Sequence, residues 1–215
     1  MNGTLRAAGS VAWREVRLEA CGREQLGVVM PFVLAMLVLA GLAFGPAPAV
    51  LVAVAPGLPW LTVLFAAVPL ARGVAAAERD DGSWEVLRGL VAPGPLLAGK
   101  VAALWLWLVT VFAGAVIVSA GLLDAAPPAA VVPAGALGTL AIAAITVVFG
   151  TVVDSSARSG LLGVVLLPAG LPALLAGTQA GTPEVPAAPW LALLVAYDLV
   201  AVALAWALYP YLLED

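Results

Sequence analysis

The sequence has no histidine, only one cysteine and few charged residues. Without histidine, the chain lacks the commonest metal and haem ligand and the usual general base of nucleophilic catalysis. Cys21 alone cannot form a disulfide within the chain, and no CxxC pair is present. We therefore expect no metal site, no firmly bound cofactor and no catalytic residues.

Charged residues make up only 10% of the 215 residues, whereas 64% are hydrophobic. Ordinary globular domains contain roughly 25% charged residues, so this chain cannot cover a water-facing surface. Lipid must then be its solvent, which predicts an all-α integral membrane protein because helices satisfy their own backbone hydrogen bonds. Nothing in the chain is basic enough for nucleic-acid binding.

The chain also lacks a phosphate-binding loop of the GxxxxGK[ST] type, and no polar segment is long enough to hold an ATPase domain. If ATP is consumed, another chain must bind it. Arginines and glutamates precede the first apolar run, which is unlike a cleavable signal peptide. We therefore expect the first apolar segment to be retained.

Apolar runs divided by turn residues predict six transmembrane helices in a single domain over residues 1–215. Each run is long enough for a span of about 20 residues. Turns rich in glycine and proline separate the first two runs, with a short helix expected over residues 49–55. The predicted spans are residues 28–44, 58–77, 101–123, 130–153, 159–180 and 190–211.

Prolines lie within three of these predicted spans. Pro31 falls in the first turn of the first span, where its missing N–H is tolerated. Pro69 is expected to kink the second span, and Pro168 and Pro172 are expected to break the fifth.

The positive charges follow the six predicted spans in an alternating pattern. Four of the nine lysines and arginines precede the first span, four lie at or between the second and third spans, and one follows the fourth. The other connectors and the C-terminus have none. Because cytoplasmic segments carry the excess of lysine and arginine, both termini and the two charged connectors are predicted to be cytoplasmic.

Residues 11–25 are predicted to form an amphipathic helix on the membrane surface. Trp13 would lie among the lipid headgroups, with Arg14 and Arg17 directed largely away from its face. Glu19 is placed four residues before another arginine, which favours a helix. The alternative is a solvated segment that leads into the first span.

The longest polar interruption, residues 78–100, is predicted to dock a partner in the cytoplasm. Asp81-Gly82 marks a turn, and Ser83 can cap a short helix parallel to the membrane. The prolines at 93 and 95 are expected to end that helix. The alternative is a solvated loop. The residues assigned to docking are Glu78, Asp81, Gly82, Ser83, Trp84, Glu85, Leu87 and Arg88.

Asp198 is the clearest charge within a predicted span. A carboxyl group at this depth is costly and should face the bundle or a cavity. One interpretation is a site for a proton or a substrate. The other is a neutral acid that fixes packing through a hydrogen bond to Thr110, Thr139 or Thr146.

Several short motifs occur together in one order. They are Trp13-Arg14-x-x-Arg17-Leu18-Glu19, Phe44-Gly45-Pro46-x-Pro48, Ala55-Pro56-Gly57, Glu78 with Asp81-Gly82-Ser83-x-Glu85-x-Leu87, and Leu97-Ala98-Gly99-Lys100-Val101. In this order the chain resembles the CcmB family, which are permease subunits of the haem exporter of cytochrome c maturation. The second half matches by topology alone, and Asp198 is not carried over from the family.

The resemblance implies the fold of ABC-2-type exporter permeases, with an elbow helix at 11–25 and a coupling helix at 80–91 within the cytoplasmic loop 78–100. It implies a bacterial inner-membrane complex with a cytoplasmic ATPase and a haem-handling membrane subunit; a homodimer is a further arrangement to consider. Haem would be the transported substrate, or ATP would drive release of a haem-loaded chaperone. The absence of histidine fits the release of a haem-loaded chaperone, although Met30, Met36, Tyr197 and Cys21 remain as weak ligands of haem iron.

Three rival functions stay open at this point. The first is an ABC-2-type permease for a lipid, drug or polysaccharide. The second is an intramembrane enzyme that uses Asp198, although a lone acid without a base or metal partner supports it poorly. The third is a passive assembly scaffold.

The docking interpretation of residues 78–100 predicts the effect of a double substitution. Replacing Trp84 and Glu85 together with alanine should abolish co-purification of the chain with a cytoplasmic ATPase, because the short helix would lose its apolar anchor and an acidic contact. Pull-down in mild detergent measures this. Pro127→Ala, in a connector predicted to lie on the opposite side of the membrane, is the matched control. Retention of the ATPase by the double variant would contradict the docking assignment.

Overall fold

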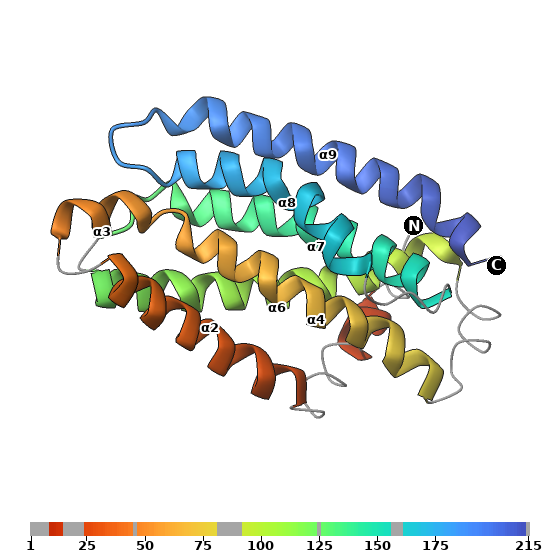
Figure 1. The fold of residues 1–215 in the computed structure, drawn as a ribbon. Coiled ribbons are helices and arrows are strands. Elements are labelled where there is room, and N and C mark those ends of the chain that lie inside the picture. The colour runs from red at the N-terminus through yellow and green to blue at the C-terminus, as the bar shows by residue number, and fades with distance from the viewer. Residues whose placement is uncertain are drawn as a thin grey trace.

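The computed structural model describes residues 9–14, 24–44, 47–80, 92–123, 126–155 and 161–213. Within these ranges every regular element is a helix, and the helices form one elongated bundle (Figure 1). Residues 9–14 are helical and precede the main elements. The others are α2 (Glu24–Phe44), α3 (Pro48–Val54), α4 (Leu58–Asp80), α6 (Pro93–Leu123), α7 (Val131–Ser155), α8 (Leu161–Ala180) and α9 (Ala187–Leu212).

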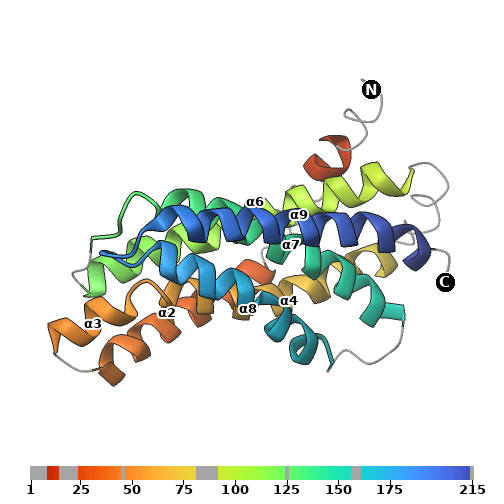
Figure 2. The same ribbon diagram turned by 90° about the horizontal axis from the view of Figure 1, so that it is seen from above.

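Successive long helices run in opposite directions along the bundle (Figures 1 and 2). As a result, the connectors that follow α2, α6 and α8 gather at one end, together with α3. We call this the α3 end. The last turns of α4, α7 and α9 lie at the opposite end, which we call the charged end because the two basic connectors of the sequence follow α4 and α7.

Among the described residues, three helices are long and apolar enough to cross a membrane: α6, residues Val131–Val152 of α7, and α9. Shorter apolar segments occur in the three remaining long helices, at Val33–Phe44, Leu58–Leu70 and Val165–Ala180. The predicted all-helical fold is therefore confirmed for the described residues, and its long apolar helices are consistent with a membrane protein. Each of the six predicted spans corresponds to one helix of the bundle, and residues 49–55 contribute to the short helix α3.

The boundaries differ most around the third predicted span. α6 begins at Pro93 rather than at residue 101, so the predicted loop 78–100 contains the end of α4 and the start of α6. Proline fits the first turn of a helix, where its missing N–H has no partner to lose. Leu96 and Leu97 are buried, and Lys100 is only 2% exposed within the helix. The prolines expected to stop one helix thus start another.

The proline predictions for two other helices were wrong. α2 begins at Glu24, which places Pro31 inside the helix rather than in its first turn. α8 continues from Leu161 to Ala180 through both Pro168 and Pro172. Neighbouring helices in a membrane protein can compensate the backbone groups that a proline leaves free, so these residues do not end the helix.

α7 is the central helix of the bundle and packs against α4, α6, α8 and α9. Alanines and glycines line it, and several of them are fully buried, including Ala141, Ala143 and Ala144. Small side chains allow helix backbones to approach closely, which is how helices associate in lipid. On α6, the ring N–H of Trp105 donates a hydrogen bond to the backbone oxygen of Ala136 at 2.8 Å and joins α6 to α7.

The indole of Trp60, on α4, fills the space that two glycines leave at the α3 end. A Cβ atom on Gly177 of α8 would lie 2.1 Å from Cζ2 of Trp60, and one on Gly138 of α7 would lie 2.6 Å from Cη2. No side chain fits at either position while the indole stays in place. Trp60 is only 1% exposed, and its indole packs α4 against both α7 and α8.

This packing predicts different effects on stability for two glycine substitutions. Gly177→Ala should lower the thermal stability of the detergent-solubilised protein, because overpacking a core costs roughly 1–3 kcal/mol. Gly114→Ala, in the interior of α6, meets nothing within 4 Å and should leave stability unchanged or raise it by up to about 1 kcal/mol. Equal melting temperatures for the two variants would show that the packing of Trp60 does not require a glycine at position 177.

Candidate functional site

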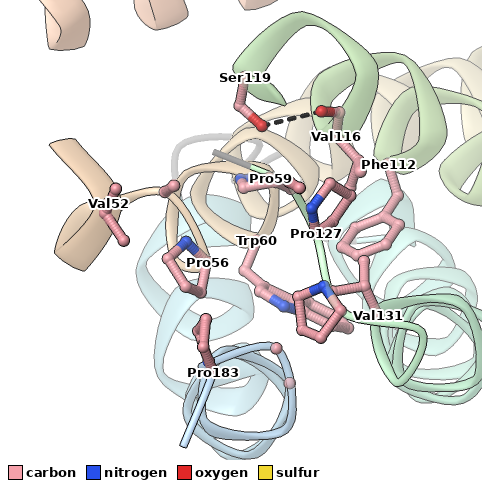
Figure 3. Close-up of a pocket in the computed structure, with 15 residues that line it drawn as sticks. Val52, Pro56, Pro59, Trp60, Phe112, Val116, Ser119, Pro127, Val131 and Pro183 are labelled. Carbon is pink, nitrogen blue, oxygen red and sulfur yellow. Dashed lines mark hydrogen bonds between the residues drawn. The ribbon is translucent and has the colours of Figure 1, made fainter. Parts of the chain in front are cut away.

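A pocket of about 180 Å³ opens at the α3 end of the bundle. Its lining comes from the stretch between α3 and the start of α4, from α6, from residues 126–131, and from the end of α8 with the residues just after it. Figure 3 shows these side chains converging on one space from all four segments. Prolines form much of the rim, at Pro56, Pro59, Pro127, Pro128 and Pro183.

Two aromatic rings line the inner part of the pocket (Figure 3). The rings of Trp60 and Phe112 have centroids 4.7 Å apart and are tilted by 53°. Phe112 in turn lies against Gly135, where an added Cβ would be 2.3 Å from its Cε1. The aromatic pair therefore packs against glycines of α7 and α8.

The pocket lining is almost entirely apolar in its chemistry. The hydroxyl of Ser119 donates a hydrogen bond to the backbone oxygen of Val116 at 3.0 Å, so it is satisfied within its own helix. None of the lining residues is ionisable, and none is a histidine, cysteine or methionine. The pocket can hold an apolar group by contact, but it supplies no ligand for a metal ion or haem iron.

Asp198 is buried in α9, at 6% exposure, as expected from its position in an apolar span. It belongs to the face that α9 turns toward the bundle, with Leu194, Ala201, Ala205 and Tyr209. These residues recur every three or four positions, which is the spacing of one helix face. Much of the rest of α9 is exposed apolar surface, which is suited to lipid.

None of the three threonines considered as partners of Asp198 forms a hydrogen bond with it. The hydroxyl of Thr139 donates to the backbone oxygen of Gly135 at 2.6 Å, and that of Thr110 donates to Leu106 at 2.8 Å. Thr146 is fully buried, but its hydroxyl has no hydrogen-bond partner among the described residues. The interpretation of Asp198 as a packing acid bonded to one of these threonines is therefore wrong.

Both carboxyl oxygens of Asp198 are without a hydrogen-bond partner in the described part of the chain. From α7, the backbone amide of Ala141 faces the carboxyl group but does not meet hydrogen-bond geometry. The adjacent Tyr197 points elsewhere, and its hydroxyl donates to the backbone oxygen of Ala169 on α8. Placing an aspartate at the centre of a membrane helix costs about 3 kcal/mol on insertion scales.

The predicted docking and interfacial residues are described only in part. Glu78 lies in the last turn of α4, whereas Asp81, Gly82, Ser83, Trp84, Glu85, Leu87 and Arg88 lie outside the described residues. Trp13 and Arg14 belong to the helical residues 9–14, and Trp13 is 69% exposed. This helix starts before residue 11, and Arg17 and Glu19 also lie outside the described ranges.

Sequence reasoning missed the pocket with its aromatic pair, although it predicts turns in the proline-rich connectors around it. Two prolines on each side of the pocket, Pro56 and Pro59 before Trp60 and Pro127 and Pro128 after α6, were the available signal. No cluster of three or more histidine, cysteine, aspartate or glutamate residues suited to a metal ion occurs among the described residues.

Comparison with known protein families gives a match that extends over almost the whole chain. The family model described as CcmB protein matches residues 6–211. No curated protein matches the chain significantly. Together with its long apolar helices, the family match identifies a multi-pass membrane protein.

Proposed function

The chain belongs to the CcmB family, and on this basis we propose that it is the membrane permease subunit of an ABC-type complex for haem export or delivery in c-type cytochrome biogenesis. The observation that carries the proposal is the family match over residues 6–211 of a chain built from apolar helices. The chain itself would have no catalytic activity, because ATP would be hydrolysed by a separate subunit.

The proposed topology has six spans with both termini in the cytoplasm of a bacterial inner membrane. The arrangement of the helices supports it, since the helix ends joined by the two basic connectors lie at one end of the bundle, and those joined by connectors without lysine or arginine lie at the other. Cytoplasmic segments carry the excess of positive charge. The charged end would then face the cytoplasm, and α3 and the pocket would lie on the outer side.

The coupling role is assigned to the segment between α4 and α6. With α4 ending at Asp80 and α6 beginning at Pro93, the segment that docks the ATPase is shorter than the predicted loop 78–100. It still contains the turn at Asp81-Gly82 and the apolar residues Trp84 and Leu87. A movement of this segment would act directly on two adjacent helices, because α4 and α6 pack against each other.

Haem is the proposed cargo of the whole complex, and we favour a role for this chain in releasing a haem-loaded chaperone from a membrane partner. The reason is ligand chemistry. Haem iron is usually held by histidine, methionine, cysteine or tyrosine, and the pocket lining has none of these. Tyr197 already donates a hydrogen bond to Ala169. The chain would thus transmit the energy of ATP hydrolysis without ligating the haem iron.

A permease that exports another substrate is the second candidate function. It is favoured by the apolar lining of the pocket, which would suit the hydrocarbon part of a lipid or drug as well as the edge of a porphyrin. The two functions share a fold and an ATPase partner, so only the fate of the substrate separates them.

Deletion of the gene for this chain should therefore abolish holocytochrome c while apocytochrome is still made and exported. Haem-stained gels and absorbance spectra of membranes measure the holocytochrome, and immunoblots measure the apoprotein. Re-expression of the wild-type chain is the control and should restore the signal. Normal holocytochrome levels in the deletion strain would reject the proposed function in favour of export of another substrate.

A further inference from the structure

We propose that Asp198 is a proton-binding site inside the membrane part of the bundle, holding its proton in the resting protein. This goes beyond the proposed function, because neither haem handling nor coupling to an ATPase requires an acid at this position. Three observations support it: the depth of Asp198, the groups that surround it and the contacts that separate it from the pocket.

The depth of Asp198 follows from its position in α9. It lies eleven residues after the start of the helix at Ala187, which is about 16 Å at a rise of about 1.5 Å per residue. That distance is close to half of a hydrocarbon layer of about 30 Å. Water at the membrane surface therefore does not reach the side chain directly, and the residue is only 6% exposed in the bundle.

No opposite charge faces Asp198 from the described parts of the helices that pack against α9. α7 has no ionisable residue from Val131 to Val152, and α8 has none from Leu161 to Ala180. α6 carries one described ionisable residue, Lys100, which is buried near the start of that helix and has an interaction of its own. On α9 itself, the neighbouring Tyr197 is engaged with Ala169.

A carboxylate in such surroundings would be a buried charge that no lysine or arginine on the described parts of α7 or α8 faces, and no donor among the described residues meets hydrogen-bond geometry with it. Buried acids in this situation become neutral by keeping their proton. The unpartnered oxygens of Asp198 therefore indicate a neutral acid, and a proton is the ligand that the site binds. Ionisable residues within membrane helices commonly mark such proton sites.

The contacts above Asp198 separate it from the pocket by two side chains. Leu194 lies one turn before Asp198 on the same face of α9. A Cβ atom on Gly138 would meet Cδ2 of Leu194 at 3.4 Å and the ring of Trp60 at 2.6 Å, so these two side chains lie at the same glycine. Trp60 in turn lines the pocket. We therefore take Trp60 and Leu194 as the side chains that lie between the pocket and the acid.

Carbodiimides test this proposal directly on the full-length chain in native membrane vesicles. The protonated acid adds across one N=C bond of the reagent, and the product rearranges to a stable N-acylurea that peptide mass spectrometry locates. Dicyclohexylcarbodiimide, which enters the bilayer, should label Asp198, and the labelling should decrease as the medium is made alkaline. A water-soluble carbodiimide should label the exposed Glu184 instead.

Three variants make the experiment specific. Asp198→Asn should lose the label in this peptide, while Asp198→Glu should keep it. Trp60→Ala should open a path from the pocket to the acid, so that the water-soluble reagent now labels Asp198. A thermal melt of each variant accompanies the labelling, and Asp198→Asn should unfold at the wild-type temperature or higher, because the wild-type carboxyl group has no bond to lose among the described residues.

Two results would overturn the proposal. One is an absence of label at Asp198 with dicyclohexylcarbodiimide while Glu184 still reacts with the soluble reagent. The other is equally fast labelling of Asp198 and Glu184 by the soluble reagent in the wild-type chain, which would show an acid open to water. Neither measurement uses ATP, haem or cytochrome, so failure here leaves the proposed function untouched.

Discussion

Close approach of the helices to α7 is the constraint on which the rest of the structure depends. In lipid no hydrophobic force draws helices together, so the bundle relies on dense packing between them. α7 meets this need with alanines and glycines on almost every side, which lets α4, α6, α8 and α9 surround it. Trp60 and Phe112 then fill the spaces above its glycines, and their rings become part of the pocket.

Much of the fold could be predicted from the sequence because lipid imposes simple rules. Apolar runs divided by turns located all six long helices, and the alternation of positive charge matched their arrangement at two ends of the bundle. The errors arose at residue types that occur in two different structural settings. Proline both ends and starts helices, and Pro93 starts α6. Lysine is typical of loops, yet α6 buries Lys100.

The candidate site was less predictable, for a different reason. The pocket is made by four segments that are far apart in the chain. No local sequence pattern therefore predicts that the rings of Trp60 and Phe112 pack against each other. For Asp198, its place in an apolar run predicts both its depth and a side chain that faces the bundle, and the structure confirms the burial. The sequence does not predict how α7 and α9 are rotated about their axes, and this rotation determines which polar groups Asp198 contacts. In the structure, Asp198 forms no hydrogen bond with the threonines.

In the proposed topology, the charged end would couple to the ATPase in the cytoplasm, and the α3 end with its apolar pocket would lie on the outer side. Site-specific labelling with a membrane-impermeant maleimide tests this most directly, in a Cys21→Ser background. Glu184→Cys, at the α3 end, should react in intact spheroplasts, whereas Arg158→Cys, between α7 and α8, should react only after the membrane is opened. Reaction of Arg158→Cys from outside, with Glu184→Cys protected, would contradict the account.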